Sequence, residues 1–538
     1  MYRYIAKMTV KSKLLILAIC SLHCSQARAE YTFEQLKELS LPETYSSVEW
    51  KNLLHYDNEK SVINKESNFF LSSDGFKNPQ AEYLATLKAI TENIKQQDNH
   101  AICKYPARFD YILHSLNLKK QDFNLPICKD YQEYRKKVPI DSVSVVFAAE
   151  SNRSPSSMMG HAFLKLQGTN ENGLKEHSFS YFAAFNIENS LQFYIDIITT
   201  GIDGAYILSP YKNKIDEYLI GEKRSLWEFD INLTTEEIER LKSHIWELKG
   251  HNIKYSLVSH NCNTAVVSIL TTANPEFKTS NIKPFITPVE YLKELYNKQK
   301  IKKISIEPTE YMRKKIHKNG TKNILSANNS SRISIQYQSI SPNYVLFQLS
   351  PVYQDIRDTN SAYHDELESK IGEIGLGYSF KKNKTFVESI NILKMRSILD
   401  YTLEADYSKH FKLSLENDLS EESTNLKPTI EFGLGWGISD KMLSSYFLPK
   451  LGYRYNQYGN LYLAPEIGFI SKIGKDIKII TSYETYINSQ GNNRGYNGKY
   501  DFYIGYKVTN NQDIFVNYKY YSGTDNHNNL SVGFSYRF

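Results

Sequence analysis

The chain has 538 residues, a formal net charge of +6 and 41% hydrophobic residues, with 41 tyrosines and 26 phenylalanines. Five basic residues and no acidic ones lie in the first 29 positions, so removal of this stretch leaves a net charge of +1. A balance this close to neutral excludes the basic surface that would require nucleic acid as a partner. The histidines are scattered without the spacing of metal ligands, so we expect neither a metal site nor another cofactor.

The first 29 residues have the pattern of a secretory signal peptide. A basic region over residues 3–13 precedes an apolar stretch from Leu14 to Leu22, and Ala27 and Ala29 are the small residues that signal peptidase requires. The apolar stretch is too short to cross a bilayer as a helix. We therefore expect cleavage before Glu30 and export of the mature chain.

Residues 30–134 have the composition of a mostly helical region, and residues 135–300 combine strands and helices in an α+β unit. In that unit, Val143–Ala149 is typical of a buried strand, and Thr234 with Glu237 forms the capping box of a helix that runs to about Leu248. Residues 301–330 are rich in lysine. They are expected to form a basic linker, which is either a solvated tether or a contact with phosphate headgroups.

Cysteine usage singles out one thiol. Of the three cysteines that remain after signal cleavage, Cys103 and Cys128 lie in one polar, helical region, and a disulfide between them is favoured in an oxidising compartment. Other pairings stay open from sequence. Cys262 is then unpaired, and it stands where a polar turn enters an apolar helix. The positive end of a helix lowers the pKa of a thiol, so Cys262 is interpreted as a nucleophile.

A histidine upstream of Cys262 is the candidate base. His161 begins the alternating segment His161–Leu166, which predicts a strand, and His177 begins the next one. His161 is expected to take the thiol proton. His177 either orients His161 or is an exposed histidine at a strand start.

Three further polar residues are candidates for the oxyanion hole or the pocket. Ser154 and Ser157 precede His161, where they either orient it and line the pocket or only shape a turn. Asn261 precedes the thiol, at the helix end whose N–H groups would stabilise an oxyanion.

The last third of the chain, from about Ser331, consists of short alternating segments. In the final segment one face carries Leu530, Val532, Phe534, Tyr536 and Phe538. The segments Glu373–Phe380 and Asp501–Val508 alternate in the same way. Such alternation, with small or polar residues on the opposite face, is typical of transmembrane β-strands. We count about twelve segments and predict an antiparallel transmembrane β-barrel over residues 331–538.

A soluble β-sandwich would show the same alternation, because it also buries one face of each strand. The terminal Phe538 favours the barrel, since a strand that ends in this way resembles the recognition signal of bacterial outer-membrane proteins. That resemblance implies the barrel-insertion machinery as a partner. It predicts a Gram-negative outer membrane, with the preceding domain in the periplasm. Twelve strands leave little lumen, so the barrel is interpreted as an anchor or a lipid-handling platform.

The order of histidine before cysteine resembles the circularly permuted NlpC/P60-like branch of the papain-like folds. Longer runs are similar to the Lnb N-terminal periplasmic domain family. These runs are Ser154–Leu164, Glu222–Phe229 and Tyr255–Asn263, together with Cys103–Arg108, which resembles an N-terminal extension often seen with this family.

The resemblance implies lipoprotein N-acylation, in which a thiolate takes an acyl chain from a phospholipid and passes it to an amine. It assigns Cys262 as the nucleophile and His161 as the base, with phospholipid or lipoprotein as substrate. The named enzyme of the family has a helical membrane part, whereas this chain has strands. A transferase or an acyl hydrolase is expected. The alternatives are a peptidoglycan peptidase or amidase, and a transport or assembly barrel with a non-catalytic domain.

Overall fold

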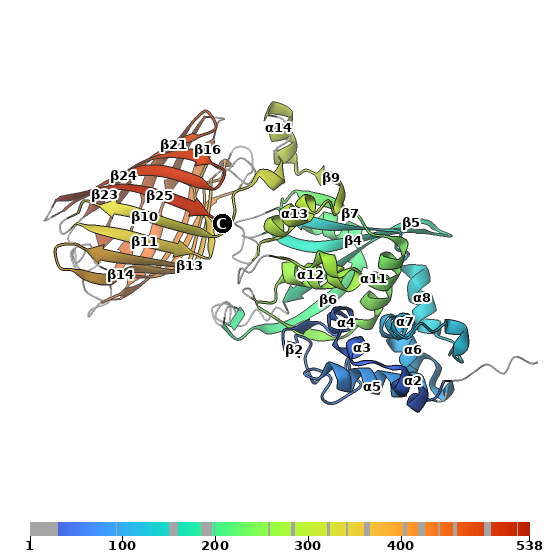
Figure 1. The fold of residues 1–538 in the computed structure, drawn as a ribbon. Helices are drawn as coiled ribbons and strands as arrows, with labels where there is room; N and C mark the ends of the chain where they lie inside the picture. Colours follow the sequence, from blue (N-terminus) through green and yellow to red (C-terminus); the bar gives the residue numbers. More distant parts are fainter. Residues whose placement is uncertain are drawn as a thin grey trace, which may run out of the picture.

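The computed structural model describes residues 31–538 except 93, 150–159, 184–195, 198, 257–258, 281–285, 320–322, 341–342, 360–365, 402–405, 418–424, 440–441, 456–459, 489–496 and 524–525. The predicted signal peptide lies outside the described residues. Figure 1 shows a part built of helices and a sheet, blue to green, next to a barrel, yellow to red, with the C-terminus at their junction. In the described part, no helix is both long enough and apolar enough to span a membrane.

The N-terminal region is helical, as predicted. Its helices are α2 (Phe33–Leu39), α3 (Pro42–Ser46), α4 (Val48–Leu53), α5 (Pro79–Ile90), α6 (Ala101–Lys104), α7 (Pro106–Ser115) and α8 (Lys129–Lys137). Cys103 in α6 and Cys128 before α8 form a disulfide with a Cα–Cα distance of 5.2 Å, which confirms the predicted pairing. Cys262 is the free cysteine of the described chain.

The α+β unit contains an antiparallel sheet in the order β8-β6-β5-β4-β3-β7-β9. Its strands are β3 (Ser142–Ala148), β4 (His161–Asn170), β5 (Gly173–Ala183), β6 (Ile202–Pro210), β7 (Leu226–Ile231), β8 (Asn252–Tyr255) and β9 (Ile301–Glu307). Helices α11 (Thr235–Glu247), α12 (Cys262–Ala273) and α13 (Pro288–Asn297) share a core with one face of the sheet. The other face packs on α10 (Tyr211–Ile215) and the following helical turn η5 (Asp216–Gly221).

Helix caps predicted from sequence are present. The Thr234 hydroxyl accepts the N–H of Glu237 at 3.2 Å, and the Glu237 carboxylate accepts the N–H of Thr234 at 2.8 Å. This capping box begins α11 and satisfies donors that lack partners inside the helix.

The lysine-rich segment expected as a linker begins later than predicted. Residues 301–307 form β9, an edge strand that pairs with β7. Ile301, Ile304 and Ile306 pack on the domain core, while the lysines between them remain outside. Because lysines stand between these isoleucines, the sequence was interpreted as a polar linker and not as a strand. Helix α14 (Glu310–Asn319) then follows.

Within the described residues, the C-terminal part is a closed antiparallel barrel of 12 strands, which confirms the prediction. The first strand, β10, pairs with the last, β25, and this pairing closes the cylinder. The wall consists of β10 (Arg332–Gln338), β11 (Tyr344–Ser350), β13 (Leu367–Ser379), β14 (Lys384–Ser397), β15 (Ser408–Glu416), β16 (Lys427–Ser439), β17 (Leu443–Leu448), β18 (Lys450–Arg454), β19 (Asn460–Leu463), β20 (Glu466–Ile473), β21 (Ile477–Thr485), β22 (Ile487–Asn488), β23 (Gly498–Thr509), β24 (Gln512–Ser522) and β25 (His527–Arg537). Three wall strands are interrupted: β17 continues as β18, β19 as β20, and β21 as β22.

Strand β25 shows how the alternation sorts the two faces of the barrel. Leu530, Val532 and Phe534 are 41–48% exposed on the outside, whereas Ser531 and Ser535 are at most 3% exposed on the inside. An apolar exterior with a polar interior is the arrangement of a membrane-spanning barrel, since lipid contacts only the outer face.

Candidate active site

Cys262 is the first residue of α12 and is 7% exposed. The backbone N–H groups of Ala162, on β4, and Asn263, in the first turn of its own helix, lie close enough to the sulfur to act on its pKa. Because Ala162 directly follows His161, the fold brings the thiol to the strand end that carries the predicted base.

The surroundings of the thiol act on its pKa in opposite directions. Burial raises the pKa of Cys262, while the N–H groups of Ala162 and Asn263 and the positive charge of Arg224 lower it, and burial dominates. The helix terminus therefore acts as expected, but the prediction of a net lowered pKa was wrong. The physical reason is that sequence shows the helix start but not how deeply the sulfur is buried.

The raised pKa predicts how Cys262 reacts with an alkylating agent. Alkylation by iodoacetamide requires the thiolate, so the rate should rise about tenfold per pH unit through pH 7–9 and reach its plateau only above the ordinary thiol pKa. Peptide mass spectrometry of the full-length protein at a series of pH values measures this rate. A plateau below pH 7 would contradict the deduced burial effect and indicate a preformed thiolate.

His161 lies at the start of β4, with its ring stacked on Phe182 at a centroid distance of 4.7 Å. Its Nε2 atom is buried and has no hydrogen-bond partner among the described residues. Burial and the positive charges of Arg224 and Lys214 hold the pKa of His161 well below its usual value. The imidazole is therefore neutral at pH 7 and able to accept a proton.

The structure does not bring His177 to the thiol. His177 lies on β5 opposite Leu166, five residues further along β4 than His161, which corresponds to about 16 Å of strand. The hairpin turn sets this register. The role of His177 as an orienting residue is therefore corrected, and the aromatic ring of Phe182 is the neighbour of His161 instead.

Three predicted site residues remain: Ser154, Ser157 and Asn261. Ser154 and Ser157 lie outside the described residues. The side-chain oxygen of Asn261 accepts the N–H groups of Asn263 at 3.0 Å and Thr264 at 3.1 Å, so it caps α12. Asn261 also lines a cavity of about 310 Å³ alongside α12.

Two residues that the sequence analysis left without a role lie next to the thiol. Arg224 is 3% exposed, is held by the carbonyl of Ala148 at 2.9 Å, and lies over the ring of Tyr218 at 4.9 Å. Tyr218 lies beside both His161 and Cys262, with its ring centroid 6.1 Å from that of His161. Arg224 therefore supplies positive charge next to the sulfur.

The hydroxyl of Tyr255 lies near the thiol of Cys262 and near the backbone N–H of the same residue. Arg224 and Tyr255 both lie in segments that resemble the Lnb family, and this resemblance was the only sequence feature that could have indicated a role for them. In the described part of the chain, no group of three or more histidine, cysteine, aspartate or glutamate side chains is arranged to hold a metal ion.

Comparison with family models places this site in a known domain. Residues 130–298 match the model of the Lnb N-terminal periplasmic domain, which includes His161, Arg224 and Cys262. The recognition made from sequence is confirmed. With the membrane-spanning barrel, the Lnb domain identifies an outer-membrane protein with a periplasmic domain.

The flanking regions match family models without an assigned function. Residues 43–115 match the domain of unknown function DUF7843, and residues 325–538 match DUF7840. No curated protein matches the chain.

Solved structures similar to part of the chain include outer-membrane proteins. The NanC porin is 11% identical and has a TM-score of 0.28 over 39% of this chain and 100% of its own. The KdgM porin is 11% identical, with a TM-score of 0.26 over 38% and 99%. The outer membrane protein Omp33 of Acinetobacter baumannii is 10% identical, with a TM-score of 0.24 over 40% and 100%.

Proposed function

We propose that this protein is a cysteine acyltransferase or acyl hydrolase, anchored in the outer membrane, that acts on phospholipid or lipoprotein through an acyl-thioester on Cys262. The observation that carries the proposal is the free thiol at the start of α12, which lies next to the strand end of His161 inside a Lnb domain. The neutral imidazole, with its unpaired Nε2, supports a role as general base.

The proposed first step begins from a neutral thiol and a neutral imidazole. As the sulfur attacks the carbonyl carbon of an ester, its proton moves to His161, and the carbonyl oxygen becomes an oxyanion. Arg224 and the hydroxyl of Tyr255 are positioned to stabilise that charge. Collapse of the intermediate breaks the ester C–O bond, and His161 returns its proton to the leaving alcohol.

The second step regenerates the enzyme. An amine or a water molecule attacks the thioester, His161 removes its proton, and the thiolate leaves and is protonated. Transfer to an amine makes the protein a transferase, and attack by water makes it a hydrolase. The membrane anchor supports a lipid donor, because it holds the Lnb domain at the bilayer surface.

The test is mass spectrometry of the full-length protein after incubation with phospholipid vesicles. We expect a fatty-acyl adduct on the Cys262 peptide that neutral hydroxylamine removes. The Cys262→Ser variant should carry either no adduct or one that resists hydroxylamine, since an oxygen ester is less reactive than a thioester. An unmodified Cys262, together with release of peptides from purified peptidoglycan, would overturn the proposal in favour of the amidase alternative.

A further inference from the structure

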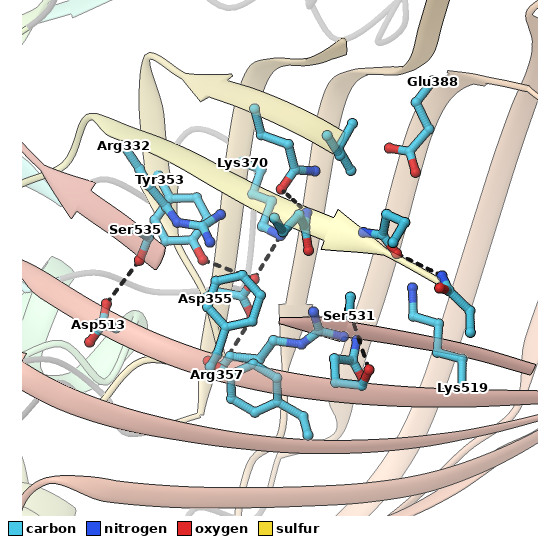
Figure 2. Close-up of a pocket in the computed structure, with 18 of the residues that line it drawn as sticks. Arg332, Tyr353, Asp355, Arg357, Lys370, Glu388, Asp513, Lys519, Ser531 and Ser535 are labelled. Carbon is cyan, nitrogen blue, oxygen red and sulfur yellow. Dashed lines mark hydrogen bonds and ion pairs between the residues drawn. The ribbon is translucent and has the colours of Figure 1, made fainter. Parts of the chain in front are cut away.

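One inward turn of the barrel points to a closure device, independent of the thiol chemistry. Strand β12 (Val352–Gln354) pairs with β13, and the chain then enters the lumen before β13 begins at Leu367. We call residues Tyr353–Thr359 the strap. Figure 2 shows Tyr353, Asp355 and Arg357 of the strap among lumen side chains. Periplasmic turns of bacterial barrels are usually short, so a long turn folded inward requires an explanation.

The strap is fixed to the wall where it enters. Tyr353 lies opposite Lys370 in the β12–β13 pairing, and the carboxylate of Asp355 is 2.6 Å from the amine of Lys370. The guanidinium of Arg332 on β10 stacks over the ring of Tyr353 at 4.5 Å. These contacts hold the near end of the strap against β13 and β10.

The strap also contacts the opposite wall. The Nζ of Lys478 on β21 donates to the carbonyl of Asp358 at 3.1 Å, and the Nζ of Lys507 on β23 donates to the carbonyl of Thr359 at 3.3 Å. The strand order β13-β11-β10-β25-β24-β23-β21 places β13 and β21 on opposite sides of a 12-strand barrel. The strap therefore crosses the lumen.

The middle of the strap is packed rather than suspended in water. Ile356 is 5% exposed and belongs to a cluster inside the barrel with Tyr446, Ile470, Ile480 and Tyr503. Burial of an isoleucine side chain stabilises this position relative to an exposed one. The strap thus has an apolar centre and ionic ends.

The strap lies at the mouth that faces the Lnb domain. Asp358 forms an ion pair with Arg537, the penultimate residue of the chain, and Arg537 also pairs with Asp513 at the start of β24. The C-terminus is at the junction of the barrel and the periplasmic part (Figure 1). At the same junction, the N–H of Ser330 donates to the carboxylate of Glu290 in α13 at 2.9 Å.

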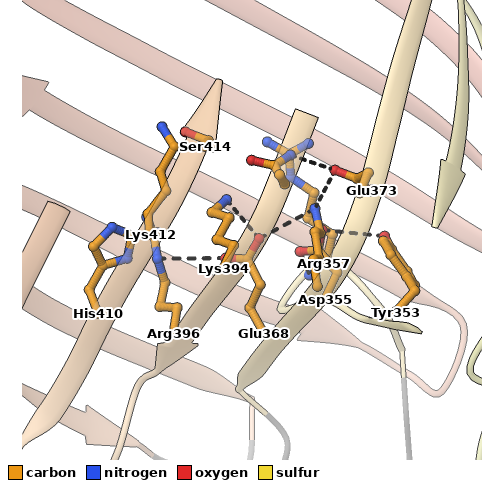
Figure 3. Close-up of polar contacts among 12 residues, drawn as sticks. Tyr353, Asp355, Arg357, Glu368, Glu373, Lys394, Arg396, His410, Lys412 and Ser414 are labelled. Carbon is orange, nitrogen blue, oxygen red and sulfur yellow. Dashed lines mark hydrogen bonds and ion pairs between the residues drawn. The ribbon is translucent and has the colours of Figure 1, made fainter. Parts of the chain in front are cut away.

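Beyond the strap, the lumen is narrowed by paired charges. Figure 3 shows Glu368 joined to both Lys394 and Arg396, and the carboxylate of Glu368 is 2.7 Å from the amine of Lys394. The space beside the strap is a cavity of about 130 Å³, which is room for a few ordered waters. Barrels of about eight strands are filled by side chains and those of 16–18 strands hold open channels. A 12-strand barrel lies between these sizes, and here the strap occupies the lumen at one end.

We propose that the strap Tyr353–Thr359 seals the periplasmic mouth of the barrel, and that the barrel conducts ions when the strap is removed. The strap carries Asp355, Arg357 and Asp358, each with an oppositely charged partner on the wall. Loss of the strap removes one ion-pair partner from each of Lys370, Asp501 and Arg537, so water must solvate these wall charges more fully. With the strap in place, the barrel is closed and does not act as a passive pore.

The experiment measures single-channel conductance of the purified full-length protein in planar lipid bilayers. One variant replaces residues 353–359 position by position with glycine and serine, which keeps the length of the turn. A milder triple variant is Asp355→Asn, Arg357→Gln and Asp358→Asn, which removes charge but preserves shape. The matched control, Lys475→Gly with Asp476→Ser, alters two exposed residues of the β20–β21 turn at the same end of the barrel.

We expect wild type and control to be silent, and the strap variant to show conductance at least about tenfold above them. The heat-dependent shift of a folded barrel in SDS gels verifies folding of each variant. If the strap variant does not fold, the triple variant decides, with an increased frequency of openings expected. Steady conductance by the wild type, or silence of a folded strap or triple variant, would overturn the proposal.

Discussion

The His161→Ala variant is expected to form the acyl-thioester on Cys262 about 10²- to 10⁴-fold more slowly than wild type. The thiol is buried with a raised pKa, so little thiolate exists at neutral pH without a base. His161 is the neutral imidazole at the adjacent strand end, and its removal takes away the proposed acceptor of the thiol proton. Quenched time courses with phospholipid vesicles, read by mass spectrometry of the Cys262 peptide, give the rate.

The matched control for this variant is His177→Ala. His177 lies on the neighbouring strand but opposite Leu166, so its loss should change the rate by less than about twofold. Raising the pH should partly restore His161→Ala, because hydroxide then generates the thiolate directly. Equal rates for His161→Ala and wild type, or an equal loss in His177→Ala, would contradict the assignment of the base.

The Arg108→Met variant is expected to destabilise the periplasmic part by about 3–5 kcal/mol. Arg108 is fully buried, donates to the carboxylate of Glu82 at 2.7 Å, and stacks over Phe69 at 4.2 Å. Its backbone N–H donates to the carboxylate of Glu247 at 3.0 Å. Removal of the guanidinium leaves two buried carboxylates without their cation.

The effect should extend to α12, the helix that begins with Cys262. Glu247 is 3.3 Å from His244, whose Nε2 is 2.8 Å from that of His55, and His55 is 2.6 Å from the hydroxyl of Ser268 in α12. Burial raises the pKa of Glu247 to about 7, and Arg108 opposes that rise. Without Arg108 the carboxyl takes up a proton more readily, so the chain of hydrogen bonds to α12 is weakened.

Urea unfolding followed by tryptophan fluorescence measures this change, since three of the four tryptophans lie before the barrel. The control is Arg135→Met. Arg135 pairs with Glu239 at 2.6 Å, but both side chains are more than a third exposed, so the expected cost is at most about 1 kcal/mol. A loss of less than about 1 kcal/mol in Arg108→Met would contradict the role of the buried cluster.

The candidate site was only partly predictable because its members come from separate elements. Cys262 and His161 could be identified by residue type at a helix start and a strand start. His177 does not face His161 because of the turn between their strands. Asn170 pairs with Gly173, which leaves a two-residue turn, and such a turn determines which residues of the two strands lie opposite each other. Arg224 approaches the sulfur from another loop, which no local pattern predicts.

The barrel shows the same division. Alternation along β25 predicted which side chains face lipid, because a strand presents successive residues to opposite faces. It did not predict the strap, whose residues Asp355 and Asp358 have the composition of an ordinary polar turn. Their partners Lys370 and Arg537 are distant in sequence and meet them only because the wall closes into a cylinder.

By itself, the sequence determined the properties that depend on neighbouring residues: the helix and strand periods, the capping box of α11, the two faces of the barrel, and the cysteine left over from the Cys103–Cys128 pair. Only the tertiary structure decided how deeply Cys262 is buried, which sets the direction of its pKa shift, and which charges meet across the lumen. Burial and long-range pairing depend on elements far apart in the chain, and for that reason no local pattern encodes them.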